Sequence, residues 1–152
     1  MIKKEILIEA PLEKVWAHIT EPERIAGWLM PNDFVAKPGA NFTFHCKVQG
    51  EIRCQVLEVI PPRKLAYSFK SSVTRVETVV TITLAPKGKH TRVTLQHSGW
   101  DRLPPADQGL ADLFGSGWGG YLENLRATAG EAAEPWPAPK SAPSAGSPRS
   151  RQ

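Results

Sequence analysis

The chain has 152 residues, of which 41% are hydrophobic and 22% charged, and its formal net charge is +4. This length and composition are typical of one globular domain and exclude a fibrous or wholly disordered protein. No apolar run approaches the roughly 18–20 residues that span a membrane, the N-terminus has no apolar signal segment, and the basic residues are not clustered with aromatic residues as on a nucleic-acid surface. We therefore expect a cytoplasmic protein with no membrane span and no nucleic-acid partner.

The N-terminal segment predicts a strand followed by two short helices. Apolar and polar residues alternate over 2–8, which indicates a strand. Pro11 suits the first turn of a helix, and a second short helix is expected to start at Glu21-Pro22. The apolar residues at helical spacing in the first helix are Leu12, Val15, Trp16 and Ile19.

A run of antiparallel strands is expected next. Alternation of apolar and polar residues predicts strands over 42–48, 52–59, 65–69, 76–84 and 91–97. The apolar phase changes after Val56, which predicts a β-bulge. Short turns join these segments, so a meander with one buried face is favoured.

The last predicted element is an amphipathic helix. Leu110, Phe114, Trp118, Leu122 and Leu125 fall at helical intervals, but several glycines interrupt them. Each glycine inside a helix costs about 1 kcal/mol relative to alanine, so the segment is either one long helix or two helices, over 107–114 and 117–129, around a kink. The sheet must cover its apolar face with this element, and the space between them is a natural ligand cavity.

The composition changes near Gly130. Residues 131–152 hold five of the 14 prolines, and Trp136 is their only large apolar side chain. Such a segment cannot bury enough surface to offset its ordering entropy, so it is interpreted as a disordered Pro/Ala/Ser-rich tail. A polyproline-type ligand for a partner domain is the alternative. Residues 1–130 then form the single folded domain.

Four segments resemble one known family. Residues 10–16 with 19–23, 56–67, 91–95 with 97–100, and 117–125 are similar, in order and spacing, to the SRPBCC (START, or birch-pollen-allergen-like) superfamily. The branch most similar is the activator of heat-shock-protein-90 ATPase homologue. This resemblance implies an α+β helix-grip fold, in which a curved antiparallel sheet wraps around a long C-terminal helix with a cavity between them.

The candidate site is the lining of that cavity. His97 follows three apolar residues on one strand face and would place a polar group at the end of the cavity. The predicted lining residues are Trp28, Phe42, Phe44, Tyr67, Phe69, His97, Trp100, Trp118 and Leu122. For most of the aromatic residues, plain core packing is the favoured interpretation, and the lining of an apolar pocket is the functional alternative.

No catalytic residue, metal site or cofactor is predicted. The run of residues 115–120 matches GxGxxG, but it lacks the preceding strand and the later acidic residue of a dinucleotide site. The four histidines and two cysteines show no metal-ligand spacing.

Cys46 and Cys54 are predicted to be neighbouring thiols. A two-residue turn at Gln49-Gly50 would place Cys46 opposite Arg53, and a three-residue loop would place it opposite Cys54. The second register is favoured because it puts the apolar residues of both strands on one face. In a reducing cytosol the two thiols would stay unpaired.

The leading functional prediction is a module that binds an apolar or amphipathic small molecule, lipid-like or aromatic. A co-chaperone-like protein interaction is one alternative, which the family resemblance implies, and a polyketide cyclase/aromatase-like enzyme is another. Whether the chain is an enzyme stays open, and a monomer is favoured.

Overall fold

The computed structural model describes residues 1–47, 50–107 and 109–130. In chain order the elements are β1 (Ile2–Ile8), α1 (Leu12–Thr20), α2 (Pro22–Trp28), β2 (Asn41–Cys46), β3 (Gly50–Ile60), β4 (Lys64–Phe69), β5 (Thr78–Lys87), β6 (His90–Ser98), the 3₁₀ turns η1 (Trp100–Arg102) and η2 (Pro105–Asp107), and α3 (Gly109–Ala129). The predicted tail, residues 131–152, lies outside the described residues.

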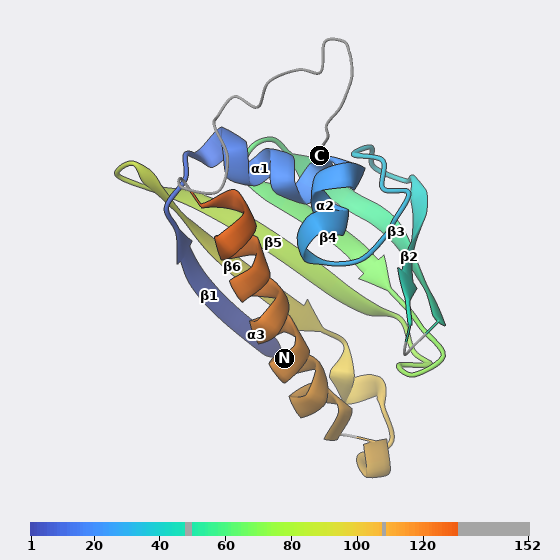
Figure 1. The fold of residues 1–152 in the computed structure, drawn as a ribbon. Coiled ribbons are helices and arrows are strands. Elements are labelled where there is room, and N and C mark those ends of the chain that lie inside the picture. The colour runs from blue at the N-terminus through green and yellow to red at the C-terminus, as the bar shows by residue number, and fades with distance from the viewer. Residues whose placement is uncertain (48–49, 108, 131–152) are drawn as a thin grey trace.

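The six strands form one antiparallel sheet in the order β1-β6-β5-β4-β3-β2. Strands β2 to β6 form the predicted meander, and β1 closes the sheet beside β6. The predicted bulge is confirmed, because the β3–β4 register shifts between Val56 and Glu58. Figure 1 shows α3 lying across the curved sheet, with α1 and α2 packed at the end where α3 finishes. The predicted α+β helix-grip fold is confirmed.

The core fills the space between the sheet and the helices. Alternate residues of β5 and β6 point inward, and Val80, Val93 and Leu95 have no exposed surface. From the other side, α3 contributes Trp118 and Leu125, which are also buried. Full burial of one such aliphatic side chain contributes about 1.5–3 kcal/mol, so this two-layer packing is the main source of stability.

Of the two alternatives for the C-terminal segment, the single long helix is confirmed and the kinked pair of helices is wrong. The segment is one continuous helix from Gly109 to Ala129. Tertiary packing of its apolar face outweighs the low helix propensity of glycine. Gly115 is buried on the side of α3 that faces β1, where an added Cβ would make an ordinary contact with Lys4 Cε at 3.9 Å.

Neither predicted register of the β2–β3 hairpin is correct. Cys46 pairs with Gly50 and Phe42 pairs with Cys54, so the two cysteines are not opposite each other. The observed register differs from the favoured one by an even number of residues. Such a shift leaves every side chain on the same face, and the alternation of apolar residues therefore cannot distinguish the two.

A lysine joins α1 to the end of α3. Lys14 is 1% exposed, and its Nζ donates a hydrogen bond to Gly130 O over 3.3 Å. The carboxyl end of a helix carries partial negative charge, which this ammonium group complements. Within residues 1–47, 50–107 and 109–130, no helix is long and apolar enough to cross a membrane.

Candidate functional site

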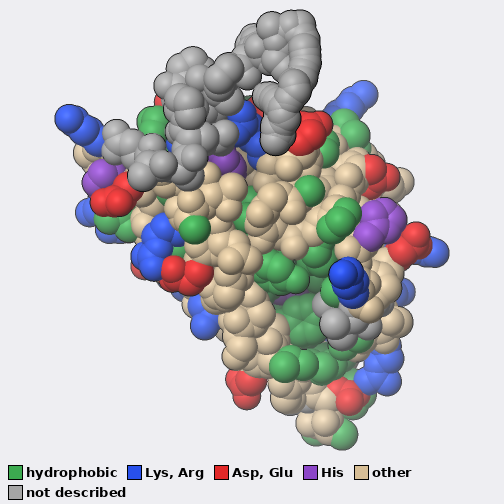
Figure 2. Space-filling model, viewed as in Figure 1, with side chains coloured by type: hydrophobic (Ala, Val, Ile, Leu, Met, Phe, Trp, Pro, Cys, Tyr) green, Lys and Arg blue, Asp and Glu red, His purple; other side chains and the backbone are tan. Residues whose placement is uncertain are grey.

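A groove of about 580 Å³ lies between the first half of α3 and the adjacent end of the sheet. Figure 2 shows hydrophobic side chains gathered there, beside α3, where the surface is hollowed. Its lining is almost entirely apolar or aromatic. The lining residues are Met30, Cys46, Phe69, Val73, Leu113, Phe114, Ser116, Gly117, Trp118 and Tyr121.

Helical periodicity explains how α3 supplies one wall of the groove. Leu113, Gly117 and Tyr121 are spaced by four residues and therefore lie along one side of the helix. An added Cβ at Gly117 would meet no atom within 4 Å, so the helix backbone itself borders open space there. This missing side chain widens the groove.

The polar groups in the lining are few. They are the hydroxyl groups of Ser116 and Tyr121 and the thiol of Cys46. Burial, and secondarily the nearby Cys46, raise the pKa of Tyr121. The Tyr121 hydroxyl therefore stays protonated at neutral pH and can donate a hydrogen bond to a ligand.

His97 lies directly behind the groove. Its ring packs against Phe69 and Trp100, with centroid distances of 5.1 and 4.7 Å. Phe114 and Trp118 pack against it at 6.0 Å. Because three of these four neighbours line the groove and His97 itself has no exposed surface, a ligand would contact its aromatic neighbours rather than the imidazole.

Hydrogen bonds fix the protonation state of His97. Trp118 Nε1 donates to His97 Nδ1 over 3.0 Å, and an indole can only donate, so Nδ1 carries no proton. His97 Nε2 then donates to Thr78 Oγ1 over 2.7 Å, and Thr78 donates to Phe69 O over 2.9 Å. Each polar hydrogen in this series of hydrogen bonds, from Trp118 through His97 to Thr78, therefore has an acceptor.

The same geometry disfavours a charged imidazolium. Protonation of Nδ1 would set two N–H groups against each other in a buried site, and burial lowers the pKa of His97 to about 3. His97 is therefore a neutral group at physiological pH. It packs against the aromatic rings and does not change its charge in this pH range.

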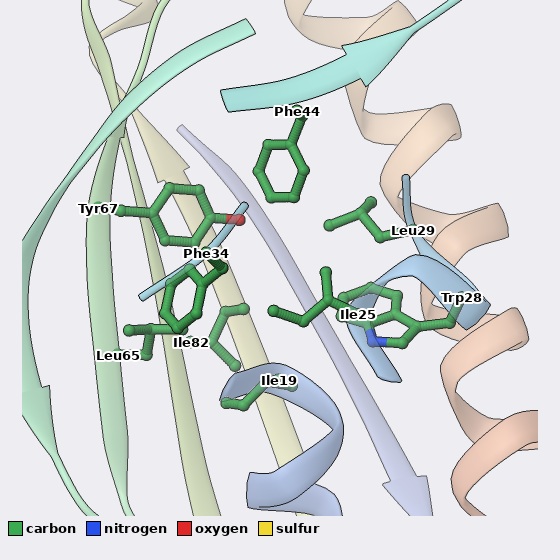
Figure 3. A pocket seen from close by; sticks show the side chains of 9 residues that line it. All are labelled: Ile19, Ile25, Trp28, Leu29, Phe34, Phe44, Leu65, Tyr67 and Ile82. Carbon is green, nitrogen blue, oxygen red and sulfur yellow. The ribbon is translucent and has the colours of Figure 1, made fainter. Parts of the chain in front are cut away.

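A second hollow, of about 10 Å³, lies deeper in the core. Figure 3 shows its nine side chains converging from α1, α2, the segment between α2 and β2, and three strands, with the Tyr67 hydroxyl pointing inward. This volume is close to the minimum for one water molecule. The space among Trp28, Phe44 and Tyr67 is thus essentially filled by their own side chains.

The nine predicted lining residues are all buried, but they separate into three groups. Trp28, Phe42, Phe44 and Tyr67 belong to the filled aromatic core, where Phe42 contacts Phe44 and Tyr67 with both centroid distances at 5.3 Å. Phe69 and Trp118 line the open groove. His97, Trp100 and Leu122 are outside both sets of lining residues.

Several groove residues were missed by the sequence reasoning. Met30 and Val73 lie in connecting segments, where no periodicity reveals which way a side chain points. Phe114 and Tyr121 do lie on the apolar stripe of α3, and their half-buried state distinguishes them from the core positions only once the sheet is in place. A tertiary structure is needed to separate these two kinds of position.

The two cysteines have different surroundings. Cys46 is half-buried in the groove lining. Cys54 is buried, and burial together with the charge of Asp33 raises its pKa, so its thiol stays protonated. In the described part of the chain, no group of three or more His, Cys, Asp or Glu side chains is arranged to hold a metal ion.

Comparison with known proteins identifies the family. The model of the Activator of Hsp90 ATPase homolog 1-like protein family matches residues 9–130. The chain belongs to this family. The match covers both walls of the groove and every element except β1, so the groove lies within the family's own domain. The search of curated proteins found no match.

Solved structures with the same fold are similar to this member of the Activator of Hsp90 ATPase homolog 1-like family. Protein BH1534 of Bacillus halodurans is 31% identical, with a TM-score of 0.72 over 84% of this chain and 95% of that one. Protein MLL2253 of Mesorhizobium loti is 29% identical, with a TM-score of 0.71 over 82% and 93%. The Aha1 dimer of Colwellia psychrerythraea shares the fold at 18% identity, with a TM-score of 0.73 over 86% and 96%.

Proposed function

We propose that the protein binds an apolar or amphipathic small molecule in the groove between α3 and the sheet. The observation that carries the proposal is the open, largely apolar hollow of about 580 Å³. Ligand sites of small molecules are typically concave, lined by apolar and aromatic side chains, and hold a few polar groups that orient the ligand. Ser116 and Tyr121 supply such groups here.

The groove suits a ligand of moderate affinity. Burial of each methylene contributes about 0.8 kcal/mol, so a ten-carbon chain gains at most about 8 kcal/mol. Association costs at least about 4 kcal/mol in lost freedom of motion. The remaining 4 kcal/mol or so corresponds to a Kd near 1 mM, and aromatic contacts with Phe114 and Trp118 would tighten it.

Filling the groove tests the proposal. Gly117→Leu adds a side chain into the open space of the lining, where no neighbouring atom obstructs the Cβ. Gly119→Leu is the matched control, because its Cβ position is equally unobstructed and lies about 200° further around the helix. Both variants gain the same helix propensity, so a difference between them reports on the groove.

The measurement is the fluorescence of the neutral probe N-phenyl-1-naphthylamine. We expect saturable binding to the wild type, at least fivefold weaker binding to Gly117→Leu, and wild-type affinity for Gly119→Leu. Equal affinities of all three folded proteins, or absence of saturable binding to the wild type, would refute the proposal.

A second candidate is docking of a partner protein at the same groove. Leu113 is 65% exposed at the rim, which is unusual for a leucine in an amphipathic helix, and the family is named for activation of a chaperone ATPase. A partner that docks on the rim would change the NMR signals of Leu113 and its exposed neighbours, and it would not occupy the interior of the groove. The Gly117→Leu variant would then retain partner binding.

The remaining predictions concern the context of the protein. A single domain over residues 1–130, a monomeric state and a cytoplasmic location are parts of the same proposal. A solved structure with the same fold is described as a dimer, so sedimentation of this protein is informative. A sedimentation coefficient of a dimer at micromolar concentration would contradict the monomeric state.

A further inference from the structure

The Tyr121 hydroxyl is a hydrogen-bond donor in the otherwise apolar helix wall of the groove. Tyr121 lines the groove, and no described residue forms a hydrogen bond with its hydroxyl group. Trp118 is the other aromatic lining residue with a donor group, but its Nε1 already donates to His97 Nδ1 over 3.0 Å. An indole has no second polar hydrogen. Among the rings of the groove, the donor available to a ligand is therefore the phenol of Tyr121.

The two other polar side chains of the lining are weaker candidates for this role. Ser116 is exposed, so water can hydrate its hydroxyl group whether or not the groove is occupied. Cys46 is half-buried, and a thiol is only a weak donor. Burial, and secondarily the nearby Cys46 on β2, raise the pKa of Tyr121 on α3. The phenol thus reaches from the helix toward the sheet wall of the groove.

A ligand that covers Tyr121 must replace the water around its hydroxyl group. If the ligand offers an oxygen acceptor at that point, the donor stays paired. If it offers only C–H groups, the donor is left unpaired in an apolar site, which is the costlier case. Binding sites of this kind discriminate between ligands that differ by a single hydrogen-bonding group.

The lining also disfavours a charged ligand, because it contains no charged residue. A charged group that moves from water into an apolar site loses its hydration, and in the lining no opposite charge compensates for that loss. An uncharged oxygen acceptor loses much less on the same transfer. The groove therefore favours a neutral acceptor over a carboxylate.

We propose that the ligand of the groove is an uncharged molecule with a carbonyl or ether oxygen, and that this oxygen accepts a hydrogen bond from the Tyr121 hydroxyl. This inference rests on the proposed function of the groove. It makes Tyr121 the residue that determines specificity, whereas Phe114 and Trp118 supply apolar contact area.

The test compares three ligands that share one ring system: naphthalene, 2-acetylnaphthalene and 2-naphthoate. Each competes with N-phenyl-1-naphthylamine for the full-length protein at neutral pH. Tyr121→Phe removes one oxygen atom and no hydrogen bond between described residues, so the variant should keep the fold. Tyr67→Phe is the matched control, because it makes the same change in the filled core, outside the groove lining.

The quantity to compare is the Kd of naphthalene divided by the Kd of 2-acetylnaphthalene in each protein. We expect Tyr121→Phe to lower this ratio about fivefold, as for the loss of one neutral hydrogen bond, and Tyr67→Phe to leave it within about twofold of the wild type. 2-Naphthoate should bind the wild type roughly tenfold more weakly than 2-acetylnaphthalene does.

Three results would overturn the inference and leave the proposed function intact. They are an unchanged ratio in Tyr121→Phe, an equal fall of the ratio in Tyr121→Phe and Tyr67→Phe, and binding of 2-naphthoate as tight as that of 2-acetylnaphthalene. Absence of saturable probe binding, or failure of all three ligands to displace the probe, would overturn both the inference and the proposed function.

Discussion

The neutral state of His97 predicts a specific loss of stability in acid. The pKa of this imidazole is about 3 in the folded protein, because of burial, against its ordinary value of 6.5. Below pH 6.5 the unfolded chain binds a proton that the folded protein does not, so stability falls as pH falls, by up to about 1.4 kcal/mol per pH unit. Between pH 7 and pH 5 this one group removes about 2 kcal/mol, and the loss continues until pH approaches 3.

The assay is urea unfolding of three proteins at pH 7 and pH 5. His97→Gln removes the buried imidazole, and its difference in unfolding free energy between the two pH values should be smaller than that of the wild type by about 2 kcal/mol. Because the two pH values are compared within one protein, a loss of stability that is the same at both pH values cancels from the difference. His45→Gln is the control, since His45 is exposed, and it should keep the wild-type difference. A pH 7-to-5 difference that is the same in His97→Gln and the wild type would refute the assignment of a neutral, buried His97.

Three further outcomes follow from the same contacts. Trp118→Phe leaves His97 Nδ1 without its donor and should lower the unfolding free energy by about 2 kcal/mol. An unchanged urea midpoint in this variant would contradict the role of that hydrogen bond. Thr78→Val preserves shape but leaves two buried polar groups unpaired, so a loss of about 3 kcal/mol is expected in the same assay; a loss below about 1 kcal/mol would mean that water replaces the hydroxyl. In a thiol-reagent titration of the native protein, Cys46 should react before Cys54, and decanol should slow the reaction of Cys46. Cys54 should react only on unfolding, and equal rates for the two thiols would contradict their different burial.

Most of the fold was predictable because its elements are strongly periodic. The strand over 2–8 and the meander could be identified from alternation, and β1 has the bounds expected for it. The continuity of α3 could not be predicted, because local propensity penalises its glycines while the compensating contacts come from residues distant in sequence. The prediction of the β2–β3 register was wrong for a different reason, since a shift of the pairing by an even number of residues leaves the alternation unchanged.

The candidate site was predictable only as a set of inward-facing aromatic residues. Sequence periodicity places Tyr67 and Phe69 on the same strand face, two residues apart. It does not reveal that Tyr67 is enclosed in a filled core while Phe69 borders an open groove. That distinction depends on where α3 diverges from the sheet and on the loop after β4.

The most direct test of a ligand-binding groove is isotope-filtered NMR of the ¹³C-labelled protein with unlabelled 1-decanol. We predict intermolecular NOEs from the decanol chain to the rings of Phe114, Trp118 and Tyr121 on α3 and to the methyl groups of Val73, all of which line the groove. NOEs confined to exposed apolar residues outside it, such as Leu57 and Ile60, would contradict the account, and so would the absence of any NOE at saturating decanol.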